Sequence, residues 1–124
     1  MNVSRGFLLM GAVYLVVGVG FGMYMGGSGD TSMVPVHAHI NLLGFTLMSI
    51  FGLAYRLIPG MGEGMLAQAH FWLHQLGALI LLVGLYLMLS GNLAESMAKM
   101  IFPVAELLVR AGLLCWLASV YRKA

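Results

Sequence analysis

The sequence predicts an all-α integral membrane protein, a bundle of four transmembrane helices that takes up the whole chain. Of its 124 residues, 61% are hydrophobic and only 8% are charged, whereas soluble domains carry about 25% charged residues. So few charges cannot cover a water-facing surface, but a lipid-facing surface is built from apolar side chains. The net charge of +2 provides no basic patch, so nucleic acid is not an expected partner.

Four apolar stretches are long enough to cross the hydrocarbon core of a membrane, which takes about 20 residues of helix. These predicted spans cover residues 6–25, 35–58, 65–90 and 100–121. Glycine-rich or proline-containing segments at 26–30, 59–62 and 90–92 separate them and predict turns. Pro35 and Pro103 fall in the first turns of the second and fourth spans, where a missing N–H costs little. Linkers this short predict antiparallel neighbours within one domain, residues 1–124.

Positively charged residues predict how the helices are oriented. Arg5, Arg56, Arg122 and Lys123 lie at the N-terminus, in the second connection and at the C-terminus, which four spans place on the same side. The first and third connections offer only Lys99. Because Lys and Arg are retained in cytoplasmic loops, we expect both termini in the cytoplasm.

Ionisable residues inside a span are candidates for function because lipid disfavours them. Six such residues are present: His37, His39, His70, His74, Glu106 and Arg110. Glu106 and Arg110 are four residues apart and opposite in charge, which favours structural neutralisation within the helix. A role in a proton path is the alternative.

His37 and His39 begin the second span and are the first candidates for binding a cofactor. Two residues along a helix turn by about 200°, so the two rings should face nearly opposite sides and serve two different sites. The His37 face continues through Asn41, Gly44, Met48 and Gly52. Glycines at this spacing leave room for a flat ligand or for a close neighbouring helix. Asn41 and Gly44 therefore join the two histidines as candidate cofactor-binding residues.

His70 and His74 are four residues apart in the third span and should share one face with Gly77 and Gly84. Such a pair can hold one metal ion, or can supply one ligand and one supporting donor, so all four histidines are candidate metal ligands. In the competing interpretation, the histidines are ordinary polar groups at the membrane interface, and the glycines serve only to pack helices. Packing is the better account of Gly18, Gly22 and Gly26 in the first span, where no histidine is expected nearby.

Methionines offer a different metal chemistry near the same histidines. Met23, Met25 and Met33 surround the first connection, close in sequence to His37 and His39. Thioethers beside imidazoles are suitable ligands for Cu(I). A copper site built from these methionines and histidines is therefore one candidate.

Two sequence strings carry a resemblance to a known family. Residues 36–45 read VHAHINLLGF and residues 69–77 read AHFWLHQLG. They resemble short stand-alone relatives of the large subunit of haem-copper oxidases and nitric oxide reductases. The resemblance covers the second and third spans, and elsewhere it extends only to hydropathy. That large subunit has twelve helices in three arcs of four, whose second helices carry haem or copper histidines near the outer side.

The resemblance implies that His37 and His39 correspond to a pair that ligates two haems on opposite faces, and that this chain is one arc. The chain lacks the adjacent histidines and the tyrosine-linked histidine of the oxidase copper site, so oxygen reduction at such a centre is not implied. The first hypothesis is a haem b protein of the bacterial inner membrane, acting in electron transfer or gas chemistry with a quinone or a protein as redox partner. No CxxCH motif is present, which excludes covalent c-type haem. Whether a reaction is catalysed is open.

The position of the two ligand faces also bears on assembly. In a ring, His37 of one chain would meet His39 of the next, and such heterologous contacts must close. Because the related arcs close after three, a homotrimer is the favoured expectation, with a twofold dimer sharing one haem as the alternative. Two other functions stay open: a copper-handling or sensing protein, and a structural small subunit of a respiratory complex.

Overall fold

The computed structural model describes residues 1–124 and contains helices joined by short connections, with no strand. The elements are α1 (Val3–Ser28), α2 (Val34–His39), η1 (Ile40–Thr46), α3 (Leu47–Leu57), α4 (Met65–Leu89) and α5 (Glu95–Lys123). Because α2, η1 and α3 follow one another without a break, they form one span, Val34–Leu57. The chain therefore has four helices long and apolar enough to cross a membrane, which confirms the predicted all-α, four-helix fold.

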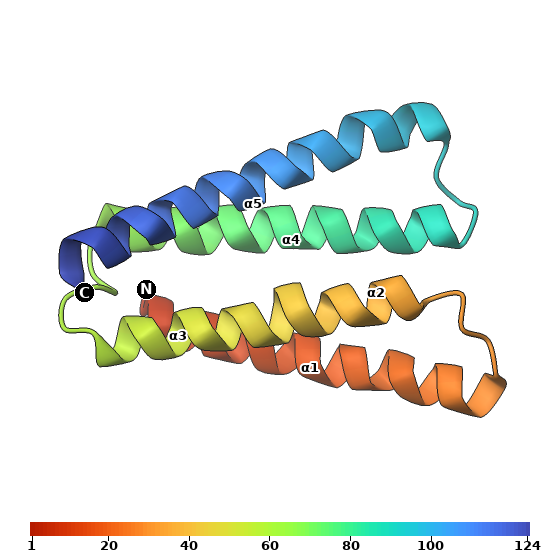
Figure 1. The fold of residues 1–124 in the computed structure, drawn as a ribbon, viewed down its shortest axis with the longest axis horizontal. Helices are drawn as coiled ribbons and strands as arrows, with labels where there is room; N and C mark the ends of the chain where they lie inside the picture. The colour runs from red at the N-terminus through yellow and green to blue at the C-terminus, as the bar shows by residue number, and fades with distance from the viewer.

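The four spans form two antiparallel hairpins (Figure 1). One hairpin consists of α1 and the span α2–η1–α3, and the other consists of α4 and α5. Both termini lie at the same end of the bundle, next to the connection at 58–64 (Figure 1). We call this the terminal end, and we call the opposite end, which holds the connections at 29–33 and 90–94, the distal end.

Helix α1 extends further than the sequence predicted. Gly26 and Gly27, expected in a turn, are helical, and α1 ends at Ser28. Gly29 follows with φ of 73° and its N–H bonds to the Met25 carbonyl at 3.0 Å. A glycine in this left-handed conformation is a common way to end a helix.

Helix α5 begins earlier than expected, which changes the position of Pro103. The helix starts at Glu95 rather than near residue 100, so Pro103 lies inside it and not in its first turn. A proline here removes the bond to the carbonyl four residues earlier, that of Lys99. Pro35, by contrast, does lie in the first turn of α2, as predicted.

The second span contains a local change of helix type. Residues Ile40–Thr46 form a π-helix between two α-helical segments. A π-helix pairs each carbonyl with the N–H five residues later and is most often a short insertion within an α-helix. Nothing in the residue pattern predicted this departure from a regular helix.

The core is concentrated at the terminal half of the bundle. The larger cluster of buried side chains includes Phe7 of α1, Phe51 and Tyr55 of α3, and Phe71 of α4. A smaller cluster of Val36, Ile40 and Leu82 lies toward the distal end. The terminal half is therefore the more tightly closed part of the fold.

Candidate functional sites at two pairs of histidines

His37 packs inside its own chain, against α1. Its Nδ1 lies 2.7 Å from the Gly18 carbonyl oxygen, and because a carbonyl only accepts, Nδ1 carries the proton and donates. A Cβ on Gly22 would lie 3.1 Å from the His37 ring. Gly18 and Gly22 are therefore packing positions, as expected, whereas a Cβ on Gly26 would meet nothing within 4 Å, so packing does not account for Gly26. The prediction that no histidine lies beside these glycines was wrong. Their missing side chains make the space that His37 occupies.

The rest of the His37 face also packs on α1. The Asn41 side chain lies directly on Gly18 and donates to the His37 carbonyl at 3.1 Å. A Cβ on Gly44 would lie 2.6 Å from atoms of Tyr14. Of the two interpretations of this stripe, the structure therefore supports the close neighbouring helix. Asn41 and Gly44 adjoin no space for a flat ligand within one chain.

His39 faces outward. It is exposed, and its Nδ1 lies 2.7 Å from the Pro35 carbonyl oxygen one turn earlier. The carbonyl accepts, so Nδ1 carries the proton and Nε2 keeps its lone pair. As the spacing of about 200° predicts, the two histidines of this pair face different surroundings: His37 faces α1, and His39 faces the outside of the chain.

His70 and His74 are fully buried at the centre of the terminal half. The two ring centroids lie 6.0 Å apart, on one face of α4 as predicted. The His70 ring lies 4.5 Å from that of Phe51, 4.9 Å from that of Phe7 and 5.6 Å from that of Trp116. Aromatic side chains of α1, α3 and α5 thus enclose the pair.

Each buried histidine makes one hydrogen bond to the second span. The Tyr55 hydroxyl lies 2.8 Å from His70 Nδ1. His74 Nε2 lies 3.1 Å from the carbonyl of Leu43, a residue of the π-helix η1, and so Nε2 is the donor. His70 Nε2 and His74 Nδ1 have no partner. The pair connects α4 to the second span, and its surroundings supply no further metal ligand.

The four histidines do not form one metal centre. No group of three or more His, Cys, Asp or Glu side chains is arranged to hold an ion. The glycines that follow His70 and His74 pack against α5, where a Cβ on Gly77 would lie 2.8 Å from Val109. The buried pair is therefore best described as a polar contact between packed helices.

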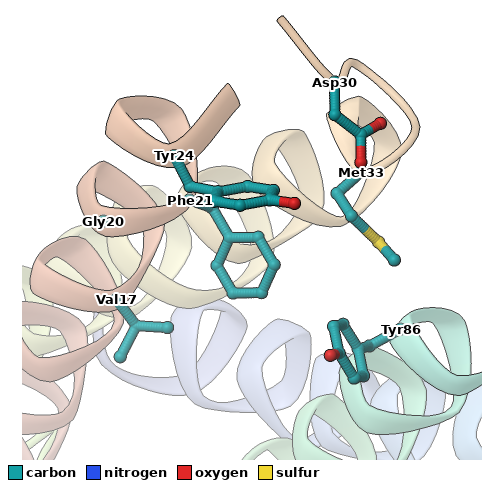
Figure 2. Close-up of a pocket in the computed structure, with 7 residues that line it drawn as sticks. All are labelled: Val17, Gly20, Phe21, Tyr24, Asp30, Met33 and Tyr86. Carbon is teal, nitrogen blue, oxygen red and sulfur yellow. The ribbon is translucent and has the colours of Figure 1, made fainter. Parts of the chain in front are cut away.

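A hollow of about 470 Å³ opens at the distal end between α1, the first connection and α4 (Figure 2). Its lining residues are Val17, Gly20, Phe21, Tyr24, Asp30, Met33 and Tyr86. Met33 points into it, while Met23 is largely exposed. The backbone N–H of Ser32 donates to Asp30 at 3.0 Å and is the main cause that holds the pKa of Asp30 below its usual value, with the Ser32 side chain as a smaller cause. The hollow thus joins aromatic walls to one carboxylate at its rim.

An apolar groove of about 370 Å³ continues from this hollow. It is lined only by hydrophobic residues of α1, the second span and α4, and it shares Val17, Phe21 and Tyr86 with the hollow. The two spaces together have the form of a slot with a polar mouth and an apolar interior.

Glu106 and Arg110 do not pair with each other. Both are exposed near the middle of α5, and the only ion pair of the chain joins Lys99 to Glu95 at 3.5 Å. The expected neutralisation within the helix is therefore absent. A lone Arg at the centre of a membrane helix costs about 2.5–3.5 kcal/mol on insertion scales, so these two charges call for a partner outside the chain.

Sequence reasoning missed Tyr55 and the aromatic side chains around the buried histidines. A tyrosine hydroxyl within an apolar span needs a hydrogen-bond partner, which is the one signal that could have paired Tyr55 with a histidine. A comparison of the chain with family models, curated proteins and solved structures finds no match. The resemblance to haem-copper oxidases therefore rests on the residues of the second and third spans alone.

Proposed function

We propose that the protein binds haem b in the membrane and that His39 is an axial ligand to the iron. The observation that carries this proposal is the exposed imidazole of His39, which has its Nδ1 bonded to the Pro35 carbonyl and its Nε2 free. Histidines that ligate metals commonly donate their other ring nitrogen to a backbone carbonyl in this way, because the bond sets the tautomer and the ring orientation. His39 therefore fits the role of a ligand.

The surroundings of the other three histidines favour roles other than that of a haem ligand. His37 has a similar bond to a carbonyl, but its ring packs against Gly22 of its own chain. His70 and His74 are fully buried and enclosed by aromatic rings. A haem held by His39 would lie against the outer surface of one chain, so a neighbouring copy is needed to enclose it.

The number of copies follows from which histidines are free. The homotrimer expected from the sequence pairs His37 with His39 of the next chain, and this requires His37 to leave the Gly18 carbonyl. The twofold dimer requires only one His39 from each chain, so we propose the dimer as the simpler assembly. Two imidazoles would make the iron six-coordinate, which favours electron transfer over gas binding. The chain's own part is to hold the two imidazoles in place.

The setting that we propose is the bacterial inner membrane, with both termini in the cytoplasm. The two termini share one end of the bundle with Arg56, and this charge bias supports the assignment. The distal end, where His39 lies, would then face outward. Reporter fusions at Ala124 and within residues 27–31 should read cytoplasm and exterior, respectively, and the reverse result contradicts this orientation.

We further propose a quinone as the redox partner. Support comes from the polar mouth of the distal hollow, with Asp30, Tyr24 and Tyr86, and from the apolar groove that continues it. Substitution of Asp30 by Asn should slow reduction of the bound haem by a short-chain quinol and leave reduction by dithionite unchanged. An unchanged quinol rate would remove this partner without affecting the haem proposal.

The haem proposal is tested by the absorbance spectrum and native mass of purified protein. Wild-type protein should show a Soret band and one haem for every two chains. His39→Ala should lose most of the haem, and added imidazole should restore it, because only a ligand is missing. His70→Leu is the comparison, and it should keep its haem because this substitution leaves His39 in place.

Four results would contradict the proposal, each in a different way. Full haem occupancy in His39→Ala excludes this ligand, and three chains with three haems would support the ring that pairs His37 with His39. Colourless protein carrying copper would favour the methionine and histidine alternative. Colourless, metal-free protein that copurifies with a respiratory complex would favour a structural subunit.

A further inference from the structure

The outward face of α5 combines two unpaired charges with a regular apolar row. Glu106 and Arg110 are exposed near the middle of the helix, and neither has a partner within the chain. The opposite face of α5 packs on α4 through buried small residues seven apart, Ala105, Gly112 and Ser119. The charges therefore lie on the side of the bundle that the chain itself leaves uncovered.

The exposed residues of this face follow the spacing of a helix–helix contact. Positions alternate by three and four residues along the helix: Met100, Pro103, Leu107, Arg110, Leu114, Leu117 and Tyr121. This alternation is the heptad pattern with which two helices pack side by side at a small crossing angle. Arg110 occupies the centre of the row, and Glu106 lies beside it. We call these eight residues the α5 face.

We propose that the α5 face binds the α5 face of a second copy of this chain, with Glu106 of each copy paired to Arg110 of the other. A twofold axis along the membrane normal brings identical depths of the two helices together. The four-residue offset between the two charges is about 6 Å along the helix, a distance that the long Arg side chain can cover. Both ion pairs then form at once, and no charge is left facing lipid.

Charge complementarity favours a second copy over lipid as the occupant of this face. Lipid chains would satisfy the leucines but would leave both charges without a partner. A twofold contact supplies each charge with its opposite, and Arg can donate two hydrogen bonds to one carboxylate. The inference does not rest on haem binding, and haem-free protein should pair in the same way.

The experiment uses charge reversal and mixing in lipid nanodiscs, with two differently tagged full-length chains. Wild-type chains should copurify with each other. Glu106→Arg and Arg110→Glu should each reduce copurification with themselves by at least tenfold, because each places like charges opposite one another. Lys99→Glu is the matched control for Arg110→Glu, since it makes the same change in charge on the same helix near its end, and it should copurify as wild type does.

Mixing the two reversed chains gives the decisive result. The Glu106→Arg chain presents two cations and the Arg110→Glu chain presents two anions, so the mixture should copurify at close to the wild-type level. If the two chains remain apart when mixed, or if either one alone pairs as wild type does, the proposed contact is wrong. If Glu106 and Arg110 paired only within their own helix, each reversed chain alone would pair as wild type does.

A cross-linking measurement covers the case in which a reversed chain does not fold. In a Cys115→Ala background, Leu114→Cys should form a disulfide-linked dimer, because position 114 lies in the α5 face. Val16→Cys is the control, since Val16 is 74% exposed on α1. This variant should give no disulfide-linked dimer. Equal cross-linking at the two positions, or none at 114, would overturn the proposal with all charges intact.

Discussion

His70 and His74 lie inside the closed terminal half of the bundle, whereas His37 and His39 lie toward the distal end, one against α1 and one outside the chain. The first pair is surrounded by aromatic rings and bonded to the second span. In the second pair, His39 has an exposed ring and a free nitrogen. The same residue type therefore lies in two different surroundings, and the two pairs differ in burial rather than only in spacing.

The largest expected difference between the two pairs is in stability. His74→Ala should lower the free energy of unfolding by about 2–4 kcal/mol, because it leaves a cavity and removes the bond to the Leu43 carbonyl. His39→Ala should leave the stability of haem-free protein nearly unchanged, since His39 is exposed. Equilibrium unfolding in mixed micelles measures both variants. Equal effects in the two variants would contradict the claim that the buried pair contributes more to stability than the exposed histidine does.

The next effect concerns the glycines that let α1 approach the second span. Gly44→Ala should destabilise the protein by about 1–3 kcal/mol, because the new Cβ would lie 2.6 Å from Tyr14. Gly20→Ala is the control, since a Cβ at Gly20 meets nothing within 4 Å. The same unfolding assay applies. A neutral Gly44→Ala variant would contradict the tight contact between α1 and the second span at Tyr14.

A smaller effect is expected from the tyrosine that bonds the buried pair. Tyr55→Phe keeps the ring in the core and removes only the hydroxyl that lies 2.8 Å from His70 Nδ1, so it should cost about 1 kcal/mol. Tyr121→Phe serves as the matched control, because Tyr121 is 88% exposed. If the two variants are equally stable, the bond between Tyr55 and His70 contributes nothing to folding.

The smallest effect lies in the first connection. The backbone N–H of Ser32 donates to Asp30 at 3.0 Å and lowers the pKa of the carboxyl group. A lowered pKa in the fold means that this contact is present above the ordinary pKa of Asp, about 3.9, and is lost as the pH falls through the lower value. NMR titration of the Asp30 carboxyl measures it. Ser32→Pro should raise that pKa, and Ser32→Ala should raise it less. If Asp30 titrates in the Ser32→Pro variant as it does in wild type, the backbone bond is not the main cause.

The sequence was sufficient to predict the spans, because hydropathy over about 20 residues depends only on composition. It also predicted that His37 and His39 face different ways and that His70 and His74 share a face, since helix geometry sets both. It did not predict the burial of His70 and His74 beneath Phe51 and Trp116, because that depends on contacts between distant spans. The start of α5 was placed late because Glu95 and Lys99 are polar, yet they pair on a helical turn outside the apolar stretch.

The π-helix at Ile40–Thr46 has a consequence for the geometry of the whole second span. One extra residue in a helical turn rotates everything beyond it by about 100° relative to an uninterrupted α-helix. The segment therefore sets the rotation between the two ends of the second span. One end carries Phe51 and Tyr55 beside the buried histidines, and the other carries His37 and His39. Deleting a single residue there, such as the exposed Leu42, would turn the distal histidines around the helix axis while the terminal half stayed in place. The direction in which His39 points thus depends on the backbone of the seven residues that follow it as much as on the histidine itself.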